Sequence, residues 1–173
     1  MRYEYTFRNT PGDYWKFRME NHYRNWTGLV SIVYTLSMLA LTIAKWNSTN
    51  GLGKALLLIF LLVFPLFQPL FVYFISIRDA QAIKADTTLS FDETGMEIRV
   101  LKHVQRIPWK SFVPDEKGGG MAIQRGSMLV VVPDQMHAYL LTNRVLGTDE
   151  EKKRLYAFMT EQLKKAGKKK EKP

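Results

Sequence analysis

Three histidines, two acidic pairs and one glycine run are the residues of this sequence whose types could take part in chemistry. The histidines, His22, His103 and His137, are scattered, and none has a second metal-type ligand at helical spacing. The chain contains no cysteine, which excludes disulfides, cysteine metal sites and a thiol nucleophile. We expect the histidines to be surface or interface residues, and we predict neither a metal nor a cofactor.

The other candidate motifs each lack a part that their chemistry needs. The run Gly118–Gly120 is not followed by the Lys-Ser/Thr pair of a phosphate-binding loop. Ser127 has neither the nucleophile-elbow motif nor an obvious base. The acidic pairs, Asp92–Glu93 and Asp115–Glu116, fall in predicted turns, where solvated carboxylates are the ordinary finding. We therefore predict no catalytic residues and a protein that is not an enzyme.

The net charge of +9 has its largest share at the C-terminal end, where six of the last ten residues are lysine. The candidate contact residues there are Lys164, Lys165, Lys168, Lys169 and Lys170. A cytoplasmic polybasic segment gains roughly 1 kcal/mol per lysine near an anionic leaflet, and a disordered solubilising tail is the alternative. Because the charge forms no patterned basic face, we predict no nucleic-acid binding.

Two uncharged segments, residues 27–44 and 55–77, are long enough to cross a bilayer as helices. The connection between them is short and turn-rich, so we expect an antiparallel transmembrane hairpin and no signal peptide. Two buried core helices of a soluble protein are the alternative. Lys/Arg residues are more numerous in the flanks of the hairpin than in its loop, which predicts that both termini are cytoplasmic. We expect a multi-pass membrane protein.

The second segment contains two prolines four residues apart, Pro65 and Pro69, with Gln68 between them. Each proline removes a backbone donor, so we predict a helix kinked near its middle. Gln68 would then bond a freed carbonyl or a hydroxyl of the first segment; the candidates are Ser31, Thr35 and Ser37. The segment holds no charged residue. A bend that packs two helices together is the favoured interpretation, and a pore formed in an oligomer is the other.

Outside the membrane segments, the N-terminus alternates aromatic and polar residues, with Tyr3, Tyr5 and Phe7 on one face of a predicted strand. Because a lone strand is not stable, we expect it to join the later sheet. Thr10 followed by Pro11 predicts the start of an amphipathic helix. This helix would lie in the membrane interface or pack on the C-terminal domain.

The C-terminal half reads as strands followed by one amphipathic helix, which is typical of a small α+β domain. Strands are predicted on both sides of a turn at 92–95, before Trp109 and on both sides of Arg125–Gly126. The helix would begin with a capping box of Thr148 and Glu151 and end at Gly167. Its apolar face consists of Leu155, Phe158, Met159 and Leu163. Trp109 is either a core or membrane-facing anchor or a ligand-binding aromatic.

Several motifs of the chain are distinctive together: LSFDETGMEIR, RIPWKSF, LVVVPDQM and the closing helix, with Tyr5-Thr6-Phe7 near the start. In these motifs the chain resembles the YcxB-like family of bacterial membrane proteins, which implies a location in the bacterial cell membrane. The resemblance implies a two-span hairpin and a C-terminal domain like the pleckstrin-homology (PH) fold. It implies no reaction and no catalytic residues. The loop VPDEKGGG and the pair Asp134-Gln135 depart from the family pattern.

Together these features predict an α+β membrane protein: a transmembrane hairpin plus a small PH-like antiparallel sheet capped by a C-terminal helix. The expected parts are the N-terminal strand and helix (1–26), the hairpin (27–77), the cytoplasmic PH-like domain (78–166) and a basic tail (167–173). We expect a non-enzymatic protein whose domain binds a lipid headgroup, anionic lipids included, or a protein partner. The alternative is a small oligomeric channel, transporter accessory or toxin-immunity protein that acts through its kinked second span.

Overall fold

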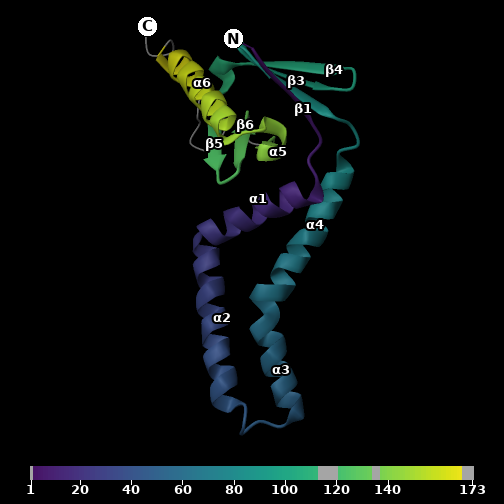
Figure 1. Ribbon diagram of the computed structural model, residues 1–173, viewed down its shortest axis with the longest axis vertical. Helices are drawn as coiled ribbons and strands as arrows, with labels where there is room; N and C mark the ends of the chain where they lie inside the picture. Colours follow the sequence, from purple (N-terminus) through teal and green to yellow (C-terminus); the bar gives the residue numbers. More distant parts are fainter. Residues whose placement is uncertain (1, 113–120, 134–136, 169–173) are drawn as a thin grey trace. The chain divides into compact units, whose positions relative to one another are not determined.

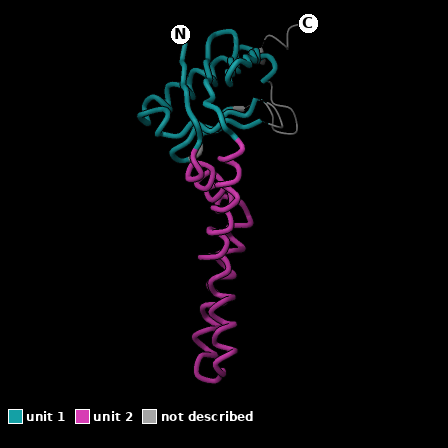
Figure 2. Tube along the Cα trace, turned by 90° about the vertical axis from the view of Figure 1, so that its right-hand side faces the viewer, with its two compact units in different colours: residues 1–9, 83–173 teal, residues 10–82 magenta. Residues whose placement is uncertain are grey.

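The computed structural model describes residues 2–112, 121–133 and 137–168, and the chain divides into two compact units (Figure 2). The first unit, here called the β-domain, comprises residues 1–9 and 83–173. The second, here called the helical unit, comprises residues 10–82. The first nine residues therefore belong with the C-terminal half of the chain, although the helical unit separates them in the sequence.

The helical unit is a series of helices joined by short turns (Figure 1). Its elements are α1 (Pro11–Arg24), α2 (Trp26–Lys45), α3 (Gly51–Leu62), the π-helical segment η1 (Val63–Phe67) and α4 (Gln68–Ala82). α1 begins at a complete capping box, in which the Thr10 hydroxyl accepts from the Asp13 N–H and the Asp13 carboxylate accepts from the Thr10 N–H. The predicted start of this helix is confirmed.

Two helices of this unit are long and apolar enough to cross a membrane: α2, and the continuous helix from Gly51 to Ala82. They contain the predicted segments, 27–44 and 55–77, and extend beyond them at both ends. In the most apolar part of the second helix no residue is buried. A core helix of a soluble protein would bury an apolar face, so this exposure favours a membrane location.

The second of these helices changes its hydrogen-bond pattern at the prolines. The N–H of Gln68 donates to the carbonyl of Val63, five residues earlier, which is the π-helical pattern. Pro65 and Pro69 have no N–H to donate. The helix changes direction where α3 gives way to α4 (Figure 1), so the predicted kink takes the form of a π-helical turn.

Gln68 does not form the hydrogen bonds that we expected with the first span. Its side-chain oxygen is buried and has no hydrogen-bond partner. The hydroxyls of Ser31, Thr35 and Ser37 donate instead to carbonyls four residues earlier in α2. The expectation was wrong because each of these hydroxyls donates its hydrogen bond to a carbonyl of its own helix.

α1 is tied to the other helices of the unit by specific contacts. The indole N–H of Trp15 donates to the carbonyl of Pro69 at 2.9 Å, and Arg18 forms an ion pair with Asp79. On the other side, His22 Nε2 lies 3.0 Å from the hydroxyl of Ser31 in α2. The predicted N-terminal helix is thus packed against both apolar helices.

The described part of the β-domain contains two antiparallel sheets (Figure 1). The first has the order β1-β2-β3-β4: β1 (Tyr3–Phe7), β2 (Thr87–Phe91), β3 (Gly95–Val100) and β4 (His103–Pro108). The second has the order β5-β6-β7: β5 (Met121–Arg125), β6 (Met128–Val132) and β7 (Tyr139–Thr142). The helical elements are η2 (Trp109–Phe112, a 3₁₀ turn), α5 (Asn143–Leu146) and α6 (Asp149–Lys168).

This topology corrects one expectation, confirms others and adds two elements that were not predicted. The predicted hairpins around 92–95 and Arg125–Gly126 are present. The single sheet is wrong, because β5 pairs with β6 and not with β4. β7 and α5 were not predicted. The predicted glycine loop, 118–120, lies outside the described residues.

β1 is an edge strand of the first sheet. Its register pairs Tyr3 with Phe91 and Phe7 with Thr87. Tyr5 and Phe7 are buried in the core, as their alternation with polar residues predicts. The expectation that the N-terminal strand joins the later sheet is therefore confirmed.

α6 closes the core through its predicted apolar face. Leu155 and Met159 are fully buried, and Phe158 and Leu163 pack against the same cluster. The helix runs on to Lys168, so the expectation that Gly167 ends it was wrong. A glycine inside a helix costs only about 1 kcal/mol relative to alanine, which neighbouring turns can offset.

The first turn of α6 is joined to β1. The hydroxyl of Thr148 accepts from the Glu151 N–H at 3.1 Å, which is one half of the predicted capping box. The Glu151 carboxylate accepts from the hydroxyl of Tyr5 at 3.0 Å. Burial raises the pKa of Tyr5, and the hydrogen bond to Glu151 raises it further. The tyrosine therefore stays a neutral donor that holds the helix start against the sheet.

Candidate functional site

Trp109 occupies the corner where β4 ends and η2 begins. Its indole N–H donates to the carbonyl of Asp92 at 2.7 Å, and its side chain is only 4% exposed. Its ring lies against three other aromatic rings, those of Phe91, Phe112 and Phe158. Trp109 is thus a core residue whose polar edge fixes the turn between β2 and β3.

That turn is organised by the carboxylate of Asp92. One carboxylate oxygen accepts from the N–H groups of Thr94 at 2.7 Å and Gly95 at 3.0 Å. The other accepts from Arg106 of β4 at 2.6 Å. Burial alone would raise the pKa of Asp92, but the hydrogen bonds from Thr94 and Gly95 and the charge of Arg106 lower it below its ordinary value.

The lowered pKa predicts an acid-sensitive turn. A carboxyl whose pKa is lower when folded contributes stability above its unfolded pKa, and that contribution is lost as pH falls through the folded value. We expect the β-domain to lose stability as pH falls below 3.8, the ordinary value for this group. Asp92→Asn should reduce the slope of stability against pH in that range. Denaturant titrations between pH 2 and 6 test this, and identical slopes for both proteins would contradict it.

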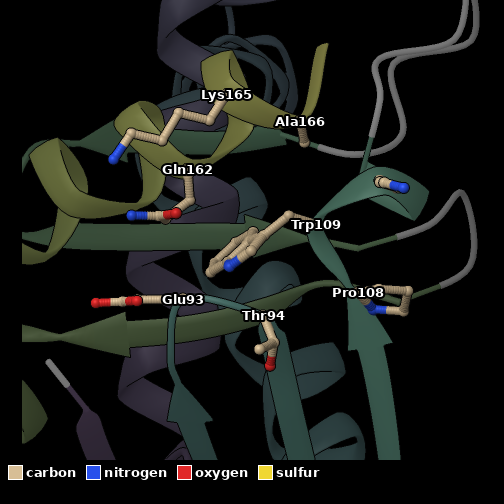
Figure 3. Close-up of a pocket in the computed structure, with 8 residues that line it drawn as sticks. Glu93, Thr94, Pro108, Trp109, Gln162, Lys165 and Ala166 are labelled. Atoms are coloured by element: carbon tan, nitrogen blue, oxygen red, sulfur yellow. The ribbon is translucent and has the colours of Figure 1, made fainter. Parts of the chain in front are cut away.

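A hollow of about 750 Å³ opens beside this corner. Its lining residues come from the β2–β3 turn, the end of β4, η2 and the last turns of α6: Glu93, Thr94, Pro108, Trp109, Lys110, Gln162, Lys165 and Ala166. Figure 3 shows the indole of Trp109 between Gln162 above it and Thr94 below it. We call this hollow the Trp109 pocket.

The Trp109 pocket has an apolar wall and a rim of mixed charge. Trp109, Pro108 and Ala166 supply the apolar surface, while Lys110 and Lys165 bring positive charge and Glu93 negative charge. Lys165 also forms an exposed ion pair with Glu161 at 2.7 Å, which raises the pKa of Lys165. Such exposed pairs are weak, so Lys165 can exchange this partner for a ligand.

The structure brings together only part of the residues singled out in the sequence. Trp109 and Lys165 share the pocket, whereas Pro65, Gln68 and Pro69 lie in the helical unit. Lys164 is exposed on α6. Lys168 is the last residue of α6, and its side chain is not described; Lys169 and Lys170 lie outside the described residues.

Four polar residues of the pocket were not predicted: Glu93, Thr94, Lys110 and Gln162. Gln162 could have been found from the sequence. Its spacing from Leu155, Met159 and Ala166 places this polar side chain in the buried, apolar stripe of α6. The other three follow from tertiary structure. Within residues 2–112, 121–133 and 137–168, no group of three or more His, Asp or Glu side chains could hold a metal ion.

The geometry of the Trp109 pocket therefore fits a small ligand that has an apolar or planar part and carries charge. Comparisons with known proteins add no assignment. No family model, no curated protein and no solved structure matches the chain.

Proposed function

We propose that this chain is a two-span protein of the bacterial cell membrane, of the YcxB-like family that it resembles, with both termini in the cytoplasm. Its β-domain is PH-like, is not an enzyme, and binds a lipid headgroup in the Trp109 pocket. The membrane part of the proposal is supported by two helices of spanning length with exposed apolar surfaces. The PH-like part is supported by antiparallel sheets with a C-terminal helix over their core.

The observation that carries the proposed binding function is the mixed rim of the Trp109 pocket. Lys110 and Lys165 are suited to a phosphate, because ammonium groups form charge-assisted hydrogen bonds with its oxygens. Glu93 on the same rim is suited to an ammonium group. A purely anionic ligand would be repelled by the Glu93 carboxylate. A zwitterionic phosphate–amine headgroup satisfies both signs of charge.

A single headgroup makes few contacts with this open hollow of mixed charge, so its affinity should be low. A soluble headgroup probe is accordingly expected to bind in the millimolar range, where NMR spectroscopy is the suitable method.

The test uses the full chain in maltoside micelles and follows the indole N–H resonance of Trp109, assigned by its loss in Trp109→Phe. Glycerophosphoethanolamine should shift this resonance in a saturable way, and glycerophosphoglycerol should shift it less. Lys110→Ala should weaken binding by about tenfold, the equivalent of losing roughly 1.4 kcal/mol. Lys153→Ala, an exposed lysine of α6 outside the pocket lining, is the matched control.

Binding of neither probe to the folded protein would overturn the headgroup proposal and leave a protein partner as the ligand of the pocket. Equal binding of both probes would contradict the role assigned to Glu93. Equal loss of affinity in Lys110→Ala and Lys153→Ala would mean that binding is a general effect of net charge and not a property of this pocket.

A further inference from the structure

Large hydrophobic side chains are almost all covered in the β-domain, and the exceptions are informative. Among its described residues, those that remain exposed are Ile83 (41%), Leu101 (78%) and Val104 (58%). The other exposed large hydrophobic residues of the described chain belong to the helical unit. Leu101 is the most exposed of them all. Single exposed hydrophobic side chains are common on soluble proteins, so the exposure of Leu101 is informative only together with its backbone and its position in the sheet.

The backbone at Leu101 is also strained. Leu101 lies in the turn between β3 and β4 with φ of 54°, and it is the one non-glycine residue with positive φ in the described chain. Two-residue hairpin turns with this geometry favour glycine or asparagine, since a side chain with a Cβ is disfavoured there. Leucine contributes neither turn chemistry nor burial at this position. A strained residue that the fold does not require is a reason to look for function.

The strand register places this turn at the end of the first sheet that contains the last residue of β1 and the first residue of β2. Phe7 pairs with Thr87, Thr87 with Val100, and Val100 with His103. The turn that carries Leu101 therefore lies at the end where β1 leads out to α1 and where β2 begins. Neighbouring strands are about 4.8 Å apart, so the turn is roughly 5–10 Å to the side of the start of β2.

The chain that links α4 to β2 at this end of the sheet is short. Only residues 83–86 separate the last residue of α4 from β2, and four residues extend at most about 14 Å. Ile83, the third exposed hydrophobic residue, lies in this link. The apolar side chains of the β-domain are thus exposed where the chain itself runs to and from the spans.

The same end of the sheet carries exposed lysines. Lys102 is exposed next to Leu101, with His103 beside it, and Lys84 is exposed in the link. The acidic groups nearby already face arginines: Glu97 accepts from Arg99 at 2.8 Å, and Asp86 lies 3.6 Å from Arg8. Apolar side chains flanked by lysines are typical of segments that lie in the membrane interface.

We propose that the β3–β4 turn is a membrane-inserting tip, in which Leu101 and Val104 enter the acyl boundary and Lys102 contacts anionic lipid phosphates. The occupant of this surface is the bilayer that α2 and the Gly51–Ala82 helix cross. The inference rests on the membrane location in the proposed function, and it is independent of the Trp109 pocket. It assigns to the β-domain a second attachment that would hold this end of the sheet on the lipid surface.

The absence of cysteine makes the test direct, because single cysteines can be labelled with the environment-sensitive dye NBD. Labels go at Leu101→Cys in the tip, at Ala157→Cys on the exposed face of α6 as a matched site in the β-domain, and at Phe71→Cys in the second span. The full chain is placed in nanodiscs of phosphatidylethanolamine and phosphatidylglycerol, with and without lipids that carry a nitroxide quencher on the acyl chain.

The expected result is blue-shifted, nitroxide-quenched emission at residues 71 and 101 and neither effect at residue 157. In a second experiment the label is placed at Val104→Cys, and Leu101→Gly is added. Glycine suits a φ of 54°, so folding should be kept or improved while the quenching at residue 104 is lost. This variant separates insertion from any structural role of Leu101.

Three results would overturn the proposal, and they differ in meaning. Quenching at residue 71 with none at residue 101 would show that the protein spans the bilayer but that the tip stays in water. A blue shift at residue 101 without quenching would assign the tip to a protein contact, such as a second copy. Absence of quenching at residue 71 would refute the membrane location, and with it both this inference and the membrane part of the proposed function.

Discussion

Trp109→Ala is expected to unfold the β-domain or to leave it barely stable. The ring is 4% exposed and contacts the rings of Phe91, Phe112 and Phe158, so its removal leaves a large cavity in the core. Replacing a buried tryptophan or phenylalanine with alanine costs about 3–5 kcal/mol. Loss of the indole N–H adds the cost of an unpaired carbonyl at Asp92. Natural domains have only about 5–15 kcal/mol of stability in total.

The measurement is amide hydrogen exchange of residues 87–108 in the full chain, which reports on β2, β3 and β4 without interference from the helical unit. The control is Trp109→Phe, which keeps an aromatic ring and loses the hydrogen bond, and it should cost about 1 kcal/mol. If Trp109→Ala exchanged no faster than Trp109→Phe, the tryptophan would be a wall of the pocket and not a support of the core.

The same residue shows what a sequence can reveal about a site. Trp109 follows a predicted strand, and its buried position agrees with the core-anchor hypothesis. Its pocket could not be read from the sequence, because Glu93 and Gln162 meet there from elements almost 70 residues apart. Periodicity reports which face of an element is covered, but it does not report which element covers it.

The fold shows the same limit. Period-two alternation is enough to locate β1, because its apolar residues, Tyr5 and Phe7, need a buried face. β7 escaped notice because Leu140 and Leu141 are consecutive apolar residues without alternation, and both are buried. A short apolar run of this kind does not distinguish a strand from part of a helix. Whether β5 pairs with β4 or only with β6 is likewise decided by tertiary contacts and not by the sequence of either strand.

In the helical unit the sequence predicts the two long apolar helices well and their contacts poorly. Length and the lack of charge are enough to locate the apolar parts of these helices, residues 27–44 and 55–77, but not the ends of the second helix at Gly51 and Ala82. The hydrogen bond from Trp15 to Pro69 joins residues on different helices, and no local pattern encodes it. The corner between α1 and α2 depends on a single small residue, and its substitution gives the second large expected effect.

Gly28 lies in the first turn of α2, directly under the last turn of α1. A Cβ placed on Gly28 would lie 2.5 Å from Tyr23 Cα and 2.8 Å from the carbonyl oxygen of His22. These are backbone atoms, which cannot rotate away as a flexible side chain would. α1 would have to swing away from α2, and the contacts that α1 makes through Trp15 and Arg18 would be strained with it.

Gly28→Ala is therefore expected to lower the free energy of unfolding of the helical unit by about 1–3 kcal/mol, the usual cost of forcing atoms into a packed site. The sign is the test, since alanine in an unobstructed helix would instead raise stability by about 1 kcal/mol. Gly51→Ala is the matched control, because Gly51 also begins an apolar helix and a Cβ there meets nothing within 4 Å. Equilibrium unfolding in mixed micelles of maltoside and dodecyl sulfate compares the two variants. If both raised stability, α1 would not be held against α2 at this corner, and the packing of α1 on α4 would have to arise without it.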